Sequence, residues 1–173
     1  REKIQEQQEV NSRVGGKATA TGVVEVEPQN GDTLFVYYRF SANGQDYGHA
    51  ALVLPTGKTP AGLPVEDGDE FTVFYVENQT YSHNLNLSMP VMAQIERYRK
   101  RVTARHIALN PNLTEQQAAC QLDIALQLKG LEGWADFYFQ EATPEENPLN
   151  NNLTYKRLVR DVPFKQAEQK TCW

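Results

Sequence analysis

The sequence predicts an α+β fold: a small antiparallel β-sheet or barrel of about five strands, then a pair of amphipathic helices and an irregular C-terminal tail. Apolar and polar side chains alternate with a period of two through much of residues 17–87. After Met89 the apolar residues recur every three or four positions, as on one face of a helix. The charge balance changes at the same place, since residues 1–87 hold 12 acids and 6 bases and residues 88–173 hold 10 and 11.

These patterns divide the chain into three parts. Residues 1–16 are polar and rich in Gln and Glu, so we expect a helical lead-in or linker that ends at Gly15-Gly16. Residues 17–87 are expected to form the β domain. Residues 88–173 are expected to form a helical region with an aromatic cluster and a tail, packed on the β domain.

The strands begin with KATATGVVEVE, from Lys17, and DTLFVYYRFSA, from Asp32. Asn43-Gly44 then favours a two-residue hairpin turn, because both central positions of such a turn take a positive φ. A loop of this length fixes the register of the two strands. The predicted opposite pairs are Phe40 with Tyr47, Tyr38 with His49, and Val36 with Ala51.

Two further strands follow a Pro- and Gly-rich connection. They are EFTVFYV, ending at Val76, and TYSHNLNLS, ending at Ser88. Five short strands joined by short turns favour an antiparallel sheet that curls into a barrel.

A first helix is expected from Met89 to Leu109, with Ser88 as its cap and Pro90 in its first turn. Its apolar stripe consists of Val91, Ile95, Tyr98 and Val102. Thr114 and Gln117 have the spacing of a capping box, which begins a second helix that ends near Gly130 or Gly133.

An aromatic segment, GWADFYFQ, follows and is too bulky to stay in water. The remaining tail is rich in Asn and Pro and is expected to be mostly irregular. Within it, Asn150–Asn152 is a candidate for disorder and YKRLVRDV for a short extra strand.

The only two cysteines, Cys120 and Cys172, are predicted to form a disulfide that ties the tail to the second helix. A cysteine one residue from the end of a polar tail has little packing reason to be there. Such a bond would place the protein in an oxidising compartment. Two unrelated thiols in a cytosolic protein are the alternative.

No catalytic, cofactor-binding or metal-binding residues are predicted. The three histidines are His49, His83 and His106, and none lies in a nucleophile-elbow motif. No spacing brings several ligands to one ion, and no glycine-rich phosphate loop is present. A hydrolase with an unrecognised site near His49 and His83 remains an alternative.

The run ERYRKRVTARH places five basic side chains on the first helix: Arg97, Arg99, Lys100, Arg101 and Arg105. This face is a candidate for binding a protein partner, an anion or a nucleic acid. The favoured interpretation is the solvated side of an amphipathic helix. The net charge of −5 gives no indication of nucleic-acid binding, and no partner of that class is predicted.

Three segments of the β domain carry a resemblance to a known family: ATATGVVEVE, VYYRFSANGQDYG and PVEDGDEFTVFYVENQTYSHN. Through them, residues 18–85 resemble a family of small bacterial envelope β domains of unknown function, which follow a membrane helix. This resemblance implies a periplasmic or otherwise extracytoplasmic domain, anchored in the inner membrane by a segment before Arg1. It implies no catalytic residues and does not cover the helical half.

Together these features favour a non-enzymatic, extracytoplasmic interaction domain of a membrane-anchored bacterial protein, with another protein as its partner. A narrower alternative is an immunity or inhibitor protein that binds a toxin or an enzyme. A hydrolase is the alternative from a different class.

Overall fold

The computed structural model describes residues 17–173, so the predicted lead-in at residues 1–16 lies outside the described residues. The side chain of His49 lies outside them as well. The chain forms two compact units. Of the described residues, we call 17–58 and 65–94 the sheet unit, and 59–64 and 95–173 the helical unit.

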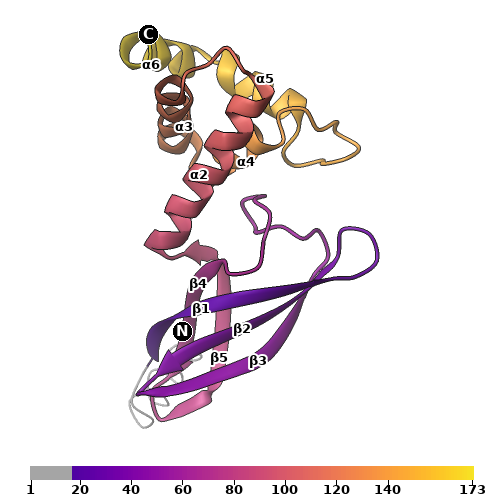
Figure 1. Cartoon of the computed structure of the whole chain (residues 1–173), viewed down its shortest axis with the longest axis vertical. Helices are drawn as coiled ribbons and strands as arrows, with labels where there is room; N and C mark the ends of the chain where they lie inside the picture. Colours follow the sequence, from indigo (N-terminus) through magenta and orange to yellow (C-terminus); the bar gives the residue numbers. More distant parts are fainter. Residues whose placement is uncertain (1–16) are drawn as a thin grey trace, which may run out of the picture. The chain divides into compact units, whose positions relative to one another are not determined.

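Within residues 17–173, the sheet unit contains five antiparallel strands in the order β3-β2-β1-β4-β5 (Figure 1). Their bounds are β1 Lys17–Pro28, β2 Leu34–Ala42, β3 Gln45–Leu54, β4 Glu70–Val76 and β5 Gln79–Pro90. This arrangement confirms the predicted antiparallel sheet, including the fifth strand after Val76.

The sheet is open, so the expectation of a barrel is wrong. Strands β3 and β5 are its edges, and neither pairs with the other in the described part of the chain. The β4–β5 ladder shifts register between Phe71 and Thr72 and again between Tyr75 and Val76. Irregularities of this kind interrupt pairing and are common at sheet edges. They leave β5 without a long, straight outer edge to which another strand of this chain could pair.

The hairpin turn is as predicted, since Asn43 and Gly44 have φ values of 55° and 75° and Phe40 pairs with Tyr47. The predicted pairs beyond it are wrong. A β-bulge between Tyr38 and Arg39 adds one residue to β3, so that Tyr38 pairs with Ala50. By the same shift Val36 pairs with Leu52. His49 is the extra residue and has no opposite partner on β2.

One face of the sheet, which we call the inner face, carries the core of this unit. Val24, Val36, Phe71 and Val73 are fully buried there. Gly22 permits close packing in the middle of this face, because a Cβ at that position would lie 2.5 Å from Cγ2 of Val73. The opposite face of the same strands is more exposed and is described below.

The helical unit contains more helix than predicted. Its helices are α2 Met92–Leu109, α3 Glu115–Lys129, α4 Leu131–Tyr138, α5 Asn152–Arg160 and α6 Val162–Thr171, of which α2 begins within the sheet unit. The two amphipathic helices are confirmed as α2 and α3. The expectation of an irregular tail is wrong, and the segment YKRLVRDV forms most of α5, the bend at Asp161 and the first residue of α6, not a strand.

Helix α2 begins later than predicted. Strand β5 continues to Pro90, which pairs with Phe71, so Ser88 is a strand residue and not a helix cap. The pairing extends further because the Val91 amide donates to the Glu70 carbonyl at 3.3 Å. Those backbone bonds outweigh the local preference for a cap at Ser88.

The capping box of α3 is confirmed, since the Gln117 amide donates to the Thr114 hydroxyl and the Thr114 amide donates to the Gln117 side chain. Gly130, with a φ of 68°, follows Lys129 and ends the helix.

The Asn run is ordered because its side chains satisfy backbone and buried groups. Asn151 caps α5 by accepting from the amides of Leu153 and Thr154. Asn150 is buried and donates to the carboxylate of Asp136, which is fully buried and also binds Lys129 at 2.5 Å. The expectation of disorder at residues 150–152 is therefore wrong.

The aromatic cluster lies in the core of the helical unit, as expected. Trp134 and Phe137 of α4 are fully buried, as is Phe164 of α6. The indole of Trp134 donates to the Leu122 carbonyl at 2.8 Å, which satisfies its only polar group. The disulfide between Cys120 and Cys172 is present and joins α3 to the end of α6.

Candidate functional site on the outer face of the sheet

The exposed face of the sheet, which we call the outer face, is built by alternate residues of three neighbouring strands. Because side chains alternate along a strand, residues opposite one another across a ladder share a face. The outer pairs between β1 and β2 are Val23 with Arg39, Glu25 with Tyr37, and Glu27 with Phe35. The outer pairs between β2 and β3 include Phe35 with Val53 and Tyr37 with Ala51.

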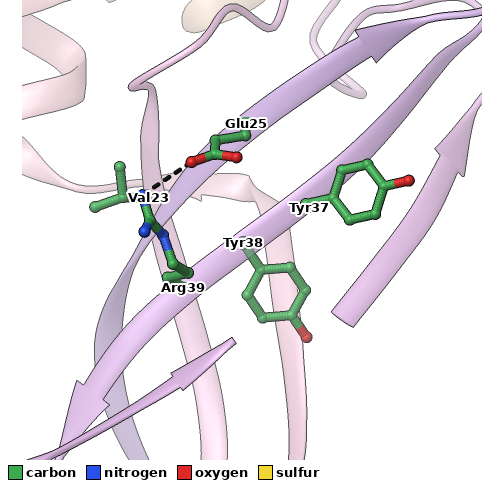
Figure 2. Close-up of a pocket in the computed structure, with 5 residues that line it drawn as sticks. All are labelled: Val23, Glu25, Tyr37, Tyr38 and Arg39. Atoms are coloured by element: carbon green, nitrogen blue, oxygen red, sulfur yellow. Dashed lines mark hydrogen bonds and ion pairs between the residues drawn. The ribbon is translucent and has the colours of Figure 1, made fainter. Parts of the chain in front are cut away.

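Arg39 lies in the middle of this face and forms an ion pair with Glu25 at 2.9 Å (Figure 2). Both side chains are 63% exposed. Exposed pairs of this kind contribute about 0–1 kcal/mol. The guanidinium can therefore exchange Glu25 for a carboxylate of another molecule at little cost.

Two hollows meet at Arg39. The smaller has a volume of about 50 Å³ and is lined by Val23, Glu25, Tyr37, Tyr38 and Arg39 (Figure 2). The larger has a volume of about 590 Å³ and is lined by Thr21, Val23, Arg39, Phe40, Ser41 and Asp46. Val23 and Arg39 line both. The outer face thus offers a guanidinium, a tyrosine and apolar surface around two depressions.

The position opposite Arg39 on β3 is a glycine, Gly48. A Cβ at Gly48 would lie 2.8 Å from Cγ of Arg39, so the glycine makes room for the aliphatic part of the arginine. The hairpin turn sets this pairing, because Arg39 with Gly48 continues the register that begins at Ala42 with Gln45, and the bulge comes only after it. The room for the Arg39 side chain therefore depends on a glycine of β3.

His83, one of the two histidines of the hydrolase hypothesis, lies near a different, open hollow. The hollow has a volume of about 450 Å³ and is lined by Lys17, Phe74, Tyr75, Val76, Ser82, His83 and Asn84. Nδ1 of His83 lies 2.7 Å from the hydroxyl of Tyr38. Burial lowers the pKa of His83, so its imidazole is mainly neutral at pH 7.

Burial also raises the pKa of Tyr38, an effect that a hydrogen bond from the backbone of Leu85 partly offsets. Tyr38 is therefore neutral, and its hydroxyl shares a hydrogen bond with His83. Among residues 17–173, His83 forms no hydrogen bond with a serine or a cysteine. His49 is on β3, at the opposite end of the strand order from β5.

His106 belongs to the core of the helical unit. Its Nε2 lies 2.6 Å from Oε1 of Gln121, and its Nδ1 lies 3.0 Å from Nε2 of Gln140. Because a glutamine oxygen accepts and its nitrogen donates, Nε2 carries the proton of a neutral imidazole. Burial lowers the pKa of His106, against a smaller opposing effect of the bonds to Gln121 and Gln140. Among residues 17–173 no group of three or more His, Cys, Asp or Glu side chains could hold a metal ion.

The basic residues of α2 are largely engaged inside the helical unit. Arg99 pairs with Asp123 and lies 5.0 Å from the Trp134 ring. Arg105 lies 4.6 Å from the Tyr138 ring and donates to the Tyr138 carbonyl at 2.6 Å.

The other three residues of the proposed basic face differ in exposure. Arg101 is half-buried and lies 5.1 Å from the Tyr98 ring. Arg97 and Lys100 are exposed. The structure thus uses Arg99, Arg101 and Arg105 in packing as well as at the surface.

The outer face was not among the sites suggested by the sequence. The sequence does contain a pattern that could have indicated it, because the residues of the outer face are every second residue of each strand. They are Val23, Glu25 and Glu27 of β1 and Phe35, Tyr37 and Arg39 of β2. Which of the two alternating sets is exposed depends on the packing of the whole sheet.

Comparison with protein-family models gives no match, and neither curated proteins nor solved structures resemble the chain detectably. The likeness to small envelope domains therefore stays an expectation. None of the helices within residues 17–173 combines the length and the apolar character needed to cross a membrane.

Proposed function

We propose that the chain is a non-enzymatic protein-interaction domain and that the outer face of the sheet is its contact surface. The observation that carries this proposal is the position of Arg39, exposed between two hollows and beside Tyr37. Arginine and tyrosine are among the residue types enriched where binding energy is concentrated at protein interfaces. Apolar surface is available beside them, because Val23 and Val53 are 36% and 57% exposed.

The charge of the sheet unit supports a basic partner. Its described residues contain nine acidic side chains and only Lys17, Arg39 and Lys58 as bases. Such an imbalance accelerates encounter with an electropositive surface and disfavours acidic partners. A carboxylate on that partner would replace Glu25 at Arg39. An inhibitor or immunity protein that binds a basic enzyme is the narrower form of this proposal.

We also propose an extracytoplasmic location for the chain. The disulfide between Cys120 and Cys172 supports this placement, since structural disulfides persist in oxidising compartments. Alkylation of the protein directly in cells of its source, followed by mass measurement, tests it. Both cysteines should resist alkylation until a reductant is added. Two alkylated cysteines before reduction would contradict an oxidising location.

A photoreactive amino acid at position 37 tests the contact surface in the same cells. We expect a discrete covalent adduct with a second protein, and we expect Arg39→Glu to abolish it. The matched control places the same amino acid at Leu128 of α3, which is exposed on the helical unit. An adduct that persists with Arg39→Glu, or one that forms at position 128 and not at 37, would contradict the proposal.

The hydrolase alternative is separated by a His83→Ala variant in the same experiment. If His83 serves the packing of the sheet, the adduct at position 37 persists and no substrate turnover is lost. A chain that binds its partner but loses a hydrolytic activity only in His83→Ala would instead be an enzyme.

A further inference from the structure

We propose that two copies of the chain associate through β3, with residues 50–54 of each copy paired antiparallel about a two-fold axis at Leu52. This inference goes beyond the proposed function, because it concerns an edge of the sheet and names a second copy of the chain as its occupant. It rests on the position, regularity and side-chain sizes of that edge.

Strand β3 is an edge strand of the sheet, and no strand of the described residues pairs with it on the side away from β2. It pairs with β2 alone, so about half of its backbone amides and carbonyls point away from the sheet. Ala51 and Val53 are exposed on its outer face, and Val53 is a β-branched residue at 57% exposure. An open edge of this kind is a template for another strand.

The segment from Ala50 to Leu54 has none of the features that usually protect an edge. It contains no charged residue and no proline, and its ladder with Leu34 to Tyr38 of β2 is regular. The bulge at His49 and the proline at position 55 lie just outside it. The other edge, β5, is uncharged too, but its ladder with β4 shifts register twice. Strand addition is therefore favoured at β3.

The side-chain sizes of the segment fit a second copy of itself. In an antiparallel pair centred on Leu52, Val53 lies opposite Ala51 of the other copy, and Leu54 lies opposite Ala50. Val53 and Leu54 thus each face an alanine, Leu52 faces Leu52 of the other copy at the axis, and no like charges oppose each other. The regular run has its middle at Leu52, so this register is the one that pairs all five residues. The contact is isologous, as in most homodimers.

The pairing also improves the surroundings of Val53. On the outer face, Val53 is already opposite Phe35, and Ala51 is opposite Tyr37. Across the two-fold axis, Val53 of one copy would lie beside Ala51 of the other, close to its Tyr37. The exposed valine would thus become an interior position of a continuous ten-stranded sheet, in which cross-strand pairs of apolar and aromatic side chains are stabilising.

An interface of five residues per copy is smaller than the roughly 1,200–2,000 Å² of total area buried in stable complexes. We therefore expect a weak dimer whose population rises with protein concentration. Sedimentation equilibrium of the full chain, from about 10 µM to about 1 mM, measures it. A chain that remains monomeric over this range overturns the proposal.

The edge is tested by Val53→Lys, which places a charge in the proposed interface on a side chain that is exposed in the single chain. The matched control is Val162→Lys, since Val162 is 62% exposed and lies on the helical unit. We expect Val53→Lys to weaken dimerisation at least about tenfold, and Val162→Lys to leave it unchanged. A dimer that is insensitive to Val53→Lys overturns the proposal, and thermal unfolding of each variant verifies that it is folded.

The register is tested by oxidative cross-linking. Leu52→Cys would place two thiols opposite each other at the axis, where directly opposed Cβ atoms are about 4.5–5.5 Å apart. We expect a covalent dimer of Leu52→Cys on a non-reducing gel. Tyr81→Cys on β5, at a residue 77% exposed, is the control and should remain mostly monomeric. Cross-linking through position 81 and not 52 would mean that the wrong edge has been chosen.

Discussion

The hydroxyl of Tyr38 on β2 lies 2.7 Å from Nδ1 of His83 on β5, although β1 and β4 separate these two strands in the sheet. Neighbouring strands are about 4.8 Å apart, so in a flat sheet β2 and β5 would be about 14 Å apart. The sheet is therefore strongly curled over its inner face. The ring of Phe40 also contacts both Tyr75 and His83 there.

Tyr38→Phe removes the hydroxyl of this pair and leaves the ring in place. We expect a loss of about 1 kcal/mol in the free energy of unfolding, because His83 loses a partly buried hydrogen-bond partner. Chemical denaturation measures the change. Tyr37→Phe is the control, since its hydroxyl is at the surface, 3.4 Å from Glu27, and its loss should change stability little. Equal effects of the two substitutions would mean that the Tyr38–His83 contact does not stabilise the curl.

Gly22→Ala tests the close packing of the inner face. The new methyl group would lie 2.5 Å from Cγ2 of Val73 and 2.9 Å from Cδ1 of Leu85, so both side chains have to move. Overpacking of this kind costs about 1–3 kcal/mol. We expect a lower denaturation midpoint, with no such change for Thr21→Ala at the neighbouring exposed position. A variant as stable as the wild type would show that the inner face has room for another methyl group.

Reduction of the disulfide should destabilise the protein. Cys120 and Cys172 are 52 residues apart in the sequence, and closing a loop of that length contributes about 4 kcal/mol in the chain-entropy description. We expect urea denaturation to shift to lower concentration when a reductant is present. The double variant Cys120→Ala/Cys172→Ala should unfold at this lower concentration with or without reductant. A wild-type midpoint that reductant leaves unchanged would contradict the expected contribution.

The stability of the helical unit should fall in mild acid because of His106. Burial holds its pKa in the folded state below the usual value of about 6.5, so below that pH the unfolded chain binds more protons than the folded one. The stabilisation from the neutral imidazole is therefore fully present above pH ~6.5 and is lost as the pH falls below it. Urea denaturation at a series of pH values measures this slope.

The change of unfolding free energy with pH also depends on the titratable groups near His106. The titratable groups near it are Tyr155, whose ring is 6.4 Å away, and Glu168, which binds Gln121. Burial, with the nearby charge of Glu168, raises the pKa of Tyr155, so this group stays neutral in mild acid.

A control experiment distinguishes the contribution of His106 from that of His83, because burial lowers the pKa of His83 as well. His106→Gln should flatten the decline below pH ~6.5, and His83→Gln should leave most of it. A decline that survives His106→Gln would assign it to other groups.

Local patterns predicted those elements that depend on near neighbours. The positive φ values at Asn43 and Gly44 follow from the turn that this pair favours, and Thr114 with Gln117 forms a capping box because both partners are three residues apart. Cys120 could be assigned to Cys172 from the sequence, because the chain contains no other cysteine.

The incorrect predictions for the C-terminal tail have one physical cause. Asn151 acts as a helix cap only because the residues after it form a helix. In α6 a single residue, Phe164, is completely buried, so the helix has little apolar pattern that a sequence could reveal. A short helix of about ten residues is marginal by itself and is stabilised by packing. Composition alone therefore made this tail resemble an irregular segment.

By itself, the sequence determined the class of the fold and the order of its parts, because alternation, helical spacing and turn residues act over a few positions. Tertiary structure alone decided that the sheet stays open, that a bulge at His49 moves Tyr38 opposite Ala50, and that Arg39 lies between two hollows. Each of these depends on which strands meet and which face is buried. That choice is made by contacts between residues far apart in the chain, and no short stretch of sequence contains it.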